Sequence, residues 1–139
     1  MTNPPTTPTI FNPAHLHDPT PNGYSTGVIA PGSARLAFIS GQGGQDRTGS
    51  LSADFATQVA QAYANLRAVL DALGAGPEHV VKLTVFVVDH DMSKLGVLTQ
   101  HVTSMFGATL PAQTLVPVPK LAVDGMLFEV EAIAVLPLD

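Results

Sequence analysis

One short stretch limits the folds open to this chain more than any other feature. Residues 80–88 read VVKLTVFVV, a run that is rich in β-branched residues and almost wholly apolar. β-Branched side chains pack well on a pleated surface, and a short apolar run of this kind is typical of a strand covered on both faces. We therefore predict that residues 80–88 form a central strand, buried on both faces by the elements around it.

Apolar residues at helical spacing predict two helices. In residues 53–73 they recur every three or four positions and give one apolar face. Ser52 is the expected N-cap, with Asp54 in the first turn, and Gly74 ends this helix. A second helix is expected to begin after a cap at Asp91 and to end at Gly107. The expected inner stripes are Phe55, Val59, Ala62, Leu66, Val69 and Leu73 in the first helix and Leu95, Leu98, Val102 and Met105 or Phe106 in the second.

Further strands are expected on both sides of these helices. Residues 24–30 and 34–40 are predicted to pair as a hairpin, and residues 113–116 and 127–135 to complete the sheet. Residues 1–23 hold many of the prolines and are typical of an irregular arm, in which residues 9–11 can still pair as an edge strand. The order of elements indicates a single α+β domain over residues 1–139, with a mixed β-sheet and two helices on one face. Something else must then cover the other face.

The composition argues against several classes of function. Lys and Arg number 6 and are scattered, and the formal net charge is −5, so we expect no nucleic-acid partner. No apolar stretch reaches the ~18 residues of a transmembrane helix, and no secretory signal is visible. We expect a cytoplasmic protein with no membrane partner. Only 12% of residues are charged, which favours an oligomer that covers apolar surface.

The chain offers little that suggests a metal or cofactor. Cysteine is absent, which excludes thiol catalysis, and none of the 5 histidines has further ligands at metal-binding spacing. His90 between Asp89 and Asp91 is better explained by a turn before a helix. The glycines of residues 41–44 form neither a dinucleotide-binding fingerprint nor a phosphate-binding loop. We therefore expect no cofactor and no metal.

Two carboxylates stand in an otherwise apolar strand near the C-terminus. Glu129 and Glu131 are two residues apart, so both point to one face of the strand together with Leu127 and Ile133. Carboxylates among apolar neighbours suit a general acid or base. The pattern is equally consistent with carboxylates that face water or accept hydrogen bonds from nearby backbone N–H groups.

Four short motifs follow one another between about Tyr24 and Val135. They are Phe38-Ile39-Ser40-Gly41-Gln42, Val85-Phe86-Val87, Leu110-Pro111-Ala112-Gln113-Thr114 and Glu129-Val130-Glu131-Ala132-Ile133-Ala134. In this order they resemble the signature segments of the RidA (YjgF) family of small trimeric proteins. The resemblance implies a chorismate-mutase-like protomer, a homotrimer whose sheets pack around a threefold axis, and clefts between subunits that bind a small-molecule ligand.

The resemblance also implies roles for individual residues. Glu129 matches a family glutamate that orients or activates water, and Ser40 and Tyr24 match positions in the family's cleft. Gln113 stands where the imine-deaminating members carry an arginine thought to grip the substrate carboxylate, and Leu115 stands where many members have a cysteine. Gln113 and Ser40 also have ordinary structural explanations, the first satisfying backbone groups near a sheet edge and the second ending a strand.

Three functions follow as hypotheses. The leading one is a RidA-like trimer whose clefts, lined by Tyr24, Ser40, Gln113 and Glu129, bind a small metabolite and hydrolyse an enamine, imine or related carbonyl compound. The second is a 2-iminobutanoate/2-iminopropanoate deaminase proper, which Gln113 disfavours because a neutral amide replaces a charged, forked donor. The third is a ligand-binding or protein-protecting module that has lost the chemistry.

Overall fold

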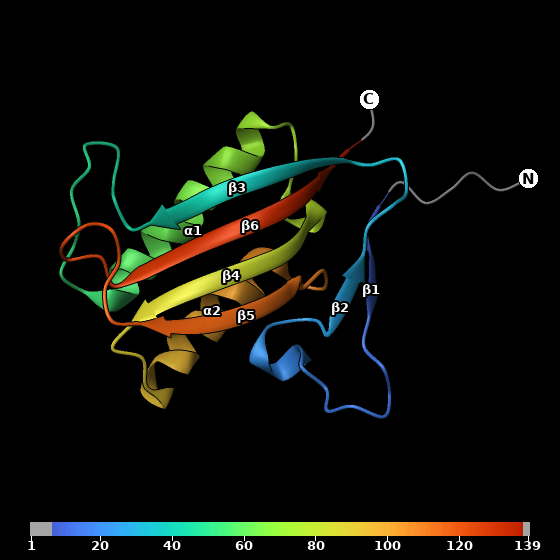
Figure 1. The fold of residues 1–139 in the computed structure, drawn as a ribbon, viewed down its shortest axis with the longest axis horizontal. Coiled ribbons are helices and arrows are strands. Elements are labelled where there is room, and N and C mark those ends of the chain that lie inside the picture. The colour runs from blue at the N-terminus through green and yellow to red at the C-terminus, as the bar shows by residue number, and fades with distance from the viewer. Residues whose placement is uncertain (1–6, 138–139) are drawn as a thin grey trace, which may run out of the picture.

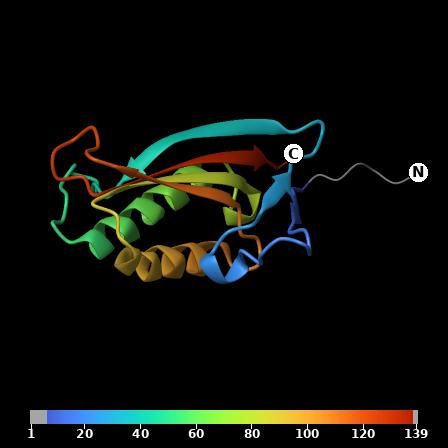
Figure 2. The same cartoon turned by 60° about the horizontal axis from the view of Figure 1, so that its bottom comes forward.

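A computed structural model describes residues 7–137 of the chain. Two helices lie side by side against one face of a four-stranded mixed sheet, so the predicted α+β class is confirmed (Figures 1 and 2). A separate pair of short strands lies beyond one end of that sheet (Figure 1). In chain order the elements are β1 (Thr9–Phe11), η1 (Thr20–Asn22), β2 (Gly27–Ile29), β3 (Arg35–Gly43), α1 (Phe55–Ala72), η2 (Pro77–His79), β4 (Val80–Val88), η3 (Met92–Lys94), α2 (Leu95–Phe106), β5 (Ala112–Val118) and β6 (Phe128–Leu136), where η marks a short 3-10 helix.

The sheet is built around β4, as predicted. The strand order is β3-β6-β4-β5, in which β4 pairs antiparallel with β6 and parallel with β5. Leu83, Val85 and Val87 face the helices and are buried, whereas Thr84 and Phe86 face the other side and are half-buried. The prediction that residues 80–88 are buried on both faces is therefore wrong for the single chain, because α1 and α2 both cover the same face.

Helix α1 packs on the sheet through most of the predicted apolar stripe, but Leu73, which was predicted to face inward, lies just past the helix and is 38% exposed. Val59 and Leu66 are completely buried, and burying one such side chain contributes roughly 1.5–3 kcal/mol. The helix is capped by Asp54, whose carboxylate accepts a hydrogen bond from the backbone N–H of Thr57 at 2.9 Å. The predicted cap, Ser52, is wrong, because its hydroxyl instead accepts a hydrogen bond from the backbone N–H of Asp54 at 3.1 Å, just before the helix begins.

A buried glutamine fastens α1 to the loop that leads into β6. The Nε2 group of Gln58 donates to the carbonyl oxygens of Ser52 at 2.7 Å and of Gly125 at 2.8 Å. Its Oε1 accepts a hydrogen bond from the backbone N–H of Leu127 at 2.8 Å. Gly44 lies directly against this residue, since a Cβ at position 44 would come within 2.7 Å of the Gln58 Cα. These contacts set the start of β6, which carries the two glutamates.

Helix α2 follows a short 3-10 turn rather than starting at its cap. The carboxylate of Asp91 accepts a hydrogen bond from the backbone N–H of Ser93 at 2.8 Å, which caps η3. The buried residues of α2 are Leu98, Val102 and Phe106, all of which were predicted to face inward, whereas Leu95 is 38% exposed. Gly107 ends the helix with a φ of 55°, as glycine permits.

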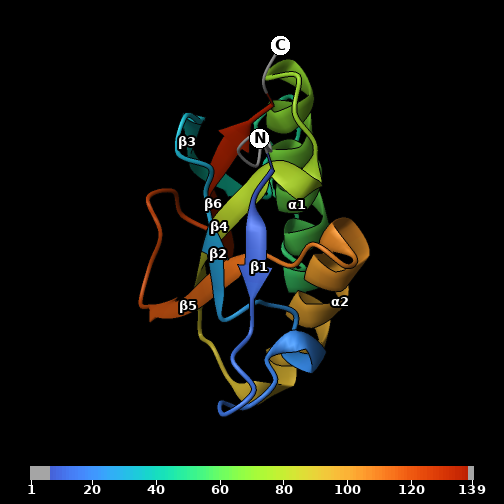
Figure 3. The same ribbon diagram turned by 90° about the vertical axis from the view of Figure 1, so that its right-hand side faces the viewer.

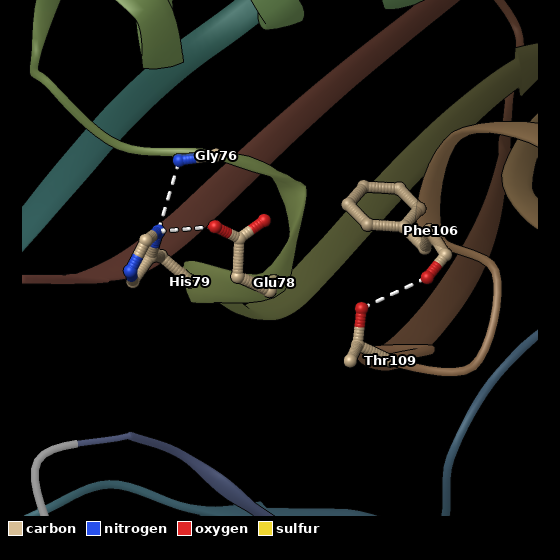
Figure 4. A network of polar contacts seen from close by, with 5 residues as sticks. All are labelled: Gly76, Glu78, His79, Phe106 and Thr109. Atoms are coloured by element: carbon tan, nitrogen blue, oxygen red, sulfur yellow. Dashed lines mark hydrogen bonds and ion pairs between the residues drawn. The ribbon is translucent and has the colours of Figure 1, made fainter.

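The turn between α1 and β4 is held by a histidine. The Nδ1 atom of His79 accepts a hydrogen bond from the backbone N–H of Gly76 at 2.9 Å, and the carboxylate of Glu78 lies 3.5 Å from the same nitrogen (Figure 4). These contacts fix the His79 ring against the backbone of the turn. At the end of α2, the Thr109 hydroxyl donates to the carbonyl oxygen of Phe106 at 2.8 Å (Figure 4).

The segment before β3 differs from the prediction. β1 pairs antiparallel with β2, which confirms the edge strand at residues 9–11. The predicted hairpin of residues 24–30 with 34–40 is wrong, because β3 pairs with β6 instead. β3 and β6 are each 9 residues long, so their pairing satisfies more backbone groups than pairing with the 3 residues of β2. Residues 1–6 of the predicted arm lie outside the described residues.

The sheet face away from the helices carries exposed apolar side chains; we call it the open face. Phe38 is 74% exposed and Leu36 is 47% exposed, both on β3. Figure 3 shows both helices on one side of the sheet, with the open face on the other side. Exposed apolar patches are typical of surfaces that contact another molecule. Within residues 7–137, neither helix is long and apolar enough to cross a bilayer.

Candidate functional site

Glu129 lies beside a β-bulge, where the pairing of β3 with β6 is irregular. The pairing of β3 with β6 shifts register between Ile39 and Gln42, so the chain bulges at Ser40 and Gly41. A Cβ built on Gly41 would overlap the Glu129 carboxylate, which therefore lies directly over the glycine backbone. The register shift, the glycine and the carboxylate form one unit, in which the missing side chain of residue 41 makes room for Glu129.

The predicted pair of glutamates does share a face, and it is the open face. Glu129 stands opposite Phe86 of β4 and is half-buried, while Glu131 stands opposite Thr84 and is exposed. Glu131 and Ser40 line a hollow of about 280 Å³ on this face. Lys82, which also lines the hollow, donates a hydrogen bond to the Thr114 hydroxyl at 2.8 Å. This side of the protomer therefore presents carboxylates, a hydroxyl and an ammonium group to whatever contacts it.

A second cavity, of about 500 Å³, lies on the helix side of the sheet; we call it the helix-side cavity. Its apolar lining comes from β4, β5 and α2 and includes Val85, Leu98 and Leu115. Gln113 and Tyr63 also line it, and neither the Gln113 Oε1 nor the Tyr63 hydroxyl has a hydrogen-bond partner among the described residues. The remaining lining residues are Asn22, Tyr24, Met92, Leu95 and Thr99.

Tyr63 is held rigidly in α1 by aromatic neighbours. Its ring stacks on His101 of α2 at 6.2 Å between centroids and 5° between planes, and it lies 5.8 Å from the ring of Phe128. The side chain is 5% exposed. Burial raises the pKa of its hydroxyl, because the phenolate would lose its hydration. The hydroxyl therefore stays protonated and remains a hydrogen-bond donor.

Tyr24 reaches the same cavity from the segment before β2. The next residue, Ser25, donates its backbone N–H to the carbonyl oxygen of Pro111 at 2.9 Å and its hydroxyl to the carbonyl oxygen of Leu110. These bonds tie the segment to the start of β5, close to Gln113. The Tyr24 hydroxyl is hydrogen-bonded to Nε2 of His17 at 3.0 Å.

The structure thus divides the predicted site residues into two groups. Tyr24, Gln113 and Leu115 line the helix-side cavity. Ser40 and Glu129 lie together at the bulge, with the glutamate on the open face. Gln113 pairs with the helix-facing Leu83, so it points away from the open face, and β4 separates its strand from that of Glu129. One protomer does not bring the two groups together.

Tyr63 is a residue of the helix-side cavity that sequence reasoning missed. It follows the predicted inward-facing Ala62 directly, so a hydroxyl beside the apolar stripe of a helix was the available signal. Within residues 7–137, no group of three or more His, Asp or Glu side chains is arranged to hold a metal ion.

Sequence comparison identifies relatives over most of the chain. A sequence model of the family described as Endoribonuclease L-PSP matches residues 16–136. The 2-iminobutanoate/2-iminopropanoate deaminase of Escherichia coli is 37% identical over 90 residues, which cover 64% of this chain and 70% of that protein. A RutC family protein of Pyrococcus horikoshii is 34% identical over 118 residues, which cover 84% of this chain and 90% of the relative.

Solved structures share the fold. YyfB of Yersinia pestis, described as a protein of unknown function of the conserved Rid family, superimposes with a TM-score of 0.89 at 32% identity, covering 94% of this chain and 99% of YyfB. RidA from the Antarctic bacterium Psychrobacter sp. gives a TM-score of 0.67 at 29% identity, covering 95% of this chain and 99% of that one. The resemblance found in the sequence is confirmed, and the chain belongs to the RidA (YjgF) family, whose sequence model is described as Endoribonuclease L-PSP.

Proposed function

We propose that this chain forms a homotrimer whose clefts, between subunits, bind a small metabolite and hydrolyse an enamine, imine or related carbonyl compound. One observation carries the proposal: the candidate residues stand on opposite faces of one sheet, with Glu129 on the open face and Gln113 in the helix-side cavity. Two groups divided in this way act on one ligand when the open face of one copy meets the cavity of the next.

The surfaces of the protomer support such an assembly. The open face exposes Phe38 and Leu36, which a neighbouring copy would remove from water. β5, which carries Gln113, is an edge strand of the sheet that Ser25 bridges at its first residue, and the cavity lies beside this edge. In a closed ring of identical subunits, each copy contacts its neighbours through two different surfaces. Glu129 on the open face and Gln113 in the helix-side cavity could meet across such a contact.

The proposed chemistry assigns the base to Glu129. Water adds to the carbon of the C=N bond, and the Glu129 carboxylate takes a proton from the attacking water as the C–O bond forms. The same proton then passes to the nitrogen and gives a carbinolamine. Glu129 next takes the proton of the new hydroxyl group and delivers it to the nitrogen, so the C=O bond forms as the C–N bond breaks and ammonia leaves. The name of the Escherichia coli relative, an imine deaminase, supports this reaction class. The description Endoribonuclease L-PSP is not proposed for this chain, because a net charge of −5 with scattered Lys and Arg does not suit RNA.

The first test replaces the proposed base. Glu129→Gln keeps the size of the side chain and removes the charge, so we expect it to abolish hydrolysis while the protein stays folded and trimeric. Glu131→Gln on the same face is the matched control and should retain most of the activity. Ammonia release is measured from imines generated in the assay by amine or amino-acid oxidation, and circular dichroism checks the fold.

The other outcomes of this test are equally informative. If no imine is hydrolysed and Glu129→Gln changes ligand affinity by about 1–3 kcal/mol, the size expected for one buried polar group, the chain is a binding module. If Glu129→Gln lowers the melting temperature and leaves both turnover and binding unchanged, Glu129 is structural and the proposed mechanism is wrong.

A second test asks whether two copies share one cleft. Leu115→Trp should fill the helix-side cavity and Glu129→Gln should remove the base, so each variant alone should be inactive. Trimers reassembled from a mixture of the two variants contain clefts in which both residues are wild type. We expect activity to return on mixing; mixtures that stay inactive would show that one subunit supplies both residues, and would contradict the shared cleft.

A further inference from the structure

The helix-side cavity contains two polar atoms that nothing in the described chain satisfies. They are the Oε1 of Gln113, on β5, and the hydroxyl of Tyr63, on α1. Buried polar atoms in folded proteins are nearly always hydrogen-bonded to protein or water, and an exception calls for an explanation. Because both atoms belong to residues of one cavity, a bound molecule that pairs with both of them is an economical explanation.

The lining of this cavity carries no charged side chain among the described residues. A carboxylate placed there would leave water without a cation of the same chain to balance it, which is costly in an apolar site. The carboxamide of Gln113 is itself neutral, and the Tyr63 hydroxyl keeps its proton. The cavity is therefore suited to a neutral molecule.

The two polar atoms also specify what such a molecule must present. The amide oxygen of Gln113 only accepts hydrogen bonds, so the ligand needs an N–H or O–H donor opposite it. The Tyr63 hydroxyl donates, so the ligand needs an acceptor such as a carbonyl oxygen. A carboxamide carries both groups side by side, and the remaining lining, with Val85, Leu98 and Leu115, suits a small aliphatic group.

We propose that the helix-side cavity selects an uncharged carboxamide, with its N–H toward Gln113 and its carbonyl toward Tyr63, over the corresponding carboxylate. This assignment rests on the proposed function only in placing the cavity beside the cleft of Glu129. It implies that the substrate is an enamine or imine whose acid group is masked as an amide, or that lacks an acid group.

A pair of probes that differ in this one group tests the assignment. Pyruvamide and pyruvate have nearly the same shape, and one is neutral while the other is an anion. Isothermal titration of each into the full-length protein should give at least roughly tenfold tighter binding of pyruvamide, the difference that one well-formed hydrogen bond makes. Gln113→Met and Tyr63→Phe should each weaken pyruvamide binding by about the same factor and leave pyruvate binding little changed.

Gln100→Met is the matched control, because Gln100 is exposed on α2 and does not line the cavity. Equal binding of the two probes, tighter binding of pyruvate, or binding of neither would overturn the assignment. These readouts need no turnover and are independent of Glu129. Tighter binding of pyruvamide without any imine hydrolysis would therefore reject the proposed hydrolase and keep the cavity assignment. Imine hydrolysis together with tighter binding of pyruvate would keep the hydrolase and reject the cavity assignment.

Discussion

At the residue scale, Gln113 is the residue through which we propose that this chain differs from the imine-deaminating members of its family. Its amide lies in a cavity lined by uncharged side chains, where those members carry a cation. A charged donor pair holds a carboxylate about twice as strongly as a neutral donor does. The same backbone position thus favours anions in one set of proteins and, as we propose, neutral molecules in this one.

The first prediction follows from this residue. Turnover of 2-iminopropanoate and 2-iminobutanoate should be roughly ten- to a hundredfold weaker than in a relative that has the arginine, because a neutral donor replaces a charged one. A coupled amino-acid oxidase assay with both proteins side by side measures it. Gln113→Arg should raise imino-acid hydrolysis; a stable but inert Gln113→Arg trimer would mean that more than one residue separates this chain from the deaminases. Comparable turnover by the unchanged protein would contradict the prediction.

The second prediction concerns Gly41, which holds Glu129 by having no side chain. Gly41→Ala should push the carboxylate away and reduce hydrolysis nearly as far as Glu129→Gln, and the added methyl group should cost about 1–3 kcal/mol of stability. Gly32→Ala is the matched control, since a Cβ at Gly32 has open space around it. Turnover and urea denaturation measure the two effects. If the Gly41→Ala protein were as active as the Gly32→Ala control, hydrolysis would not depend on the position of the Glu129 carboxylate over Gly41.

At the scale of the elements, local capping residues fix where helices begin. Asp54 and Asp91 each accept a backbone N–H at the start of a helical segment. The helix α1 that Asp54 starts packs on β3 and β6, and its Gln58 holds the loop leading to Glu129. A change at the cap of α1 is therefore expected to act on stability first and on the site only through the loop.

The third prediction is a pH dependence that originates at Asp54. Hydrogen bonds from the Thr57 hydroxyl and from its backbone N–H lower the pKa of the Asp54 carboxyl. A carboxyl whose pKa is lower in the folded state stabilises the protein above its unfolded pKa of about 3.9 and loses that effect as the pH falls through the folded pKa. Asp54→Ala should therefore lower the melting temperature at pH 7, and its difference from wild type should shrink below about pH 4.

Asp54→Ser provides the comparison for this experiment. Serine caps a helix without a titrating group, so it should keep most of the melting temperature at pH 7. Melting curves from pH 7 to pH 2 for the three proteins measure the effect. A gap between wild type and Asp54→Ala that stays constant down to the lowest pH would rule out the cap carboxylate as its source.

At the scale of the whole molecule, the sheet has one face covered by helices and one face exposed. Apolar side chains and a carboxylate pair share that exposed face, and the edge strand β5 borders the second cavity. Assembly would cover the apolar side chains and join the two groups of site residues. In the proposed trimer, stability and activity would therefore depend on the same contacts.

The fourth prediction tests this dependence. Light scattering should give about three times the chain mass of 14.4 kDa. Phe38→Lys places a charge on the exposed apolar face and should dissociate the trimer and abolish activity. Leu73→Lys, at the end of α1 on the helix side, is the matched control and should leave the assembly intact. A clean monomer of the wild-type chain at micromolar concentration would contradict the proposal, as would a Phe38→Lys protein that is still trimeric.

Local sequence determined the elements of this protein. The VVKLTVFVV run became β4, and the three-and-four spacing of apolar residues became α1, because hydrogen bonding within a helix and β-propensity act between near neighbours in the chain. The family motifs also determined the α+β class. Even so, the cap is Asp54 and not the predicted Ser52, because the Asp54 carboxylate accepts the hydrogen bond from the backbone N–H of Thr57.

Tertiary structure alone decided which residues meet. β3 pairs with β6 and not with β2, the bulge at Ser40 and Gly41 places Glu129 over Gly41, and the register of β4 with β5 places Gln113 on the face that the helices cover. Each of these outcomes depends on the pairing of segments far apart in the chain, and a slip of one residue would send every side chain of a strand to the other face. The sequence therefore named most of the candidate residues, and only strand register placed them on two sides of the sheet.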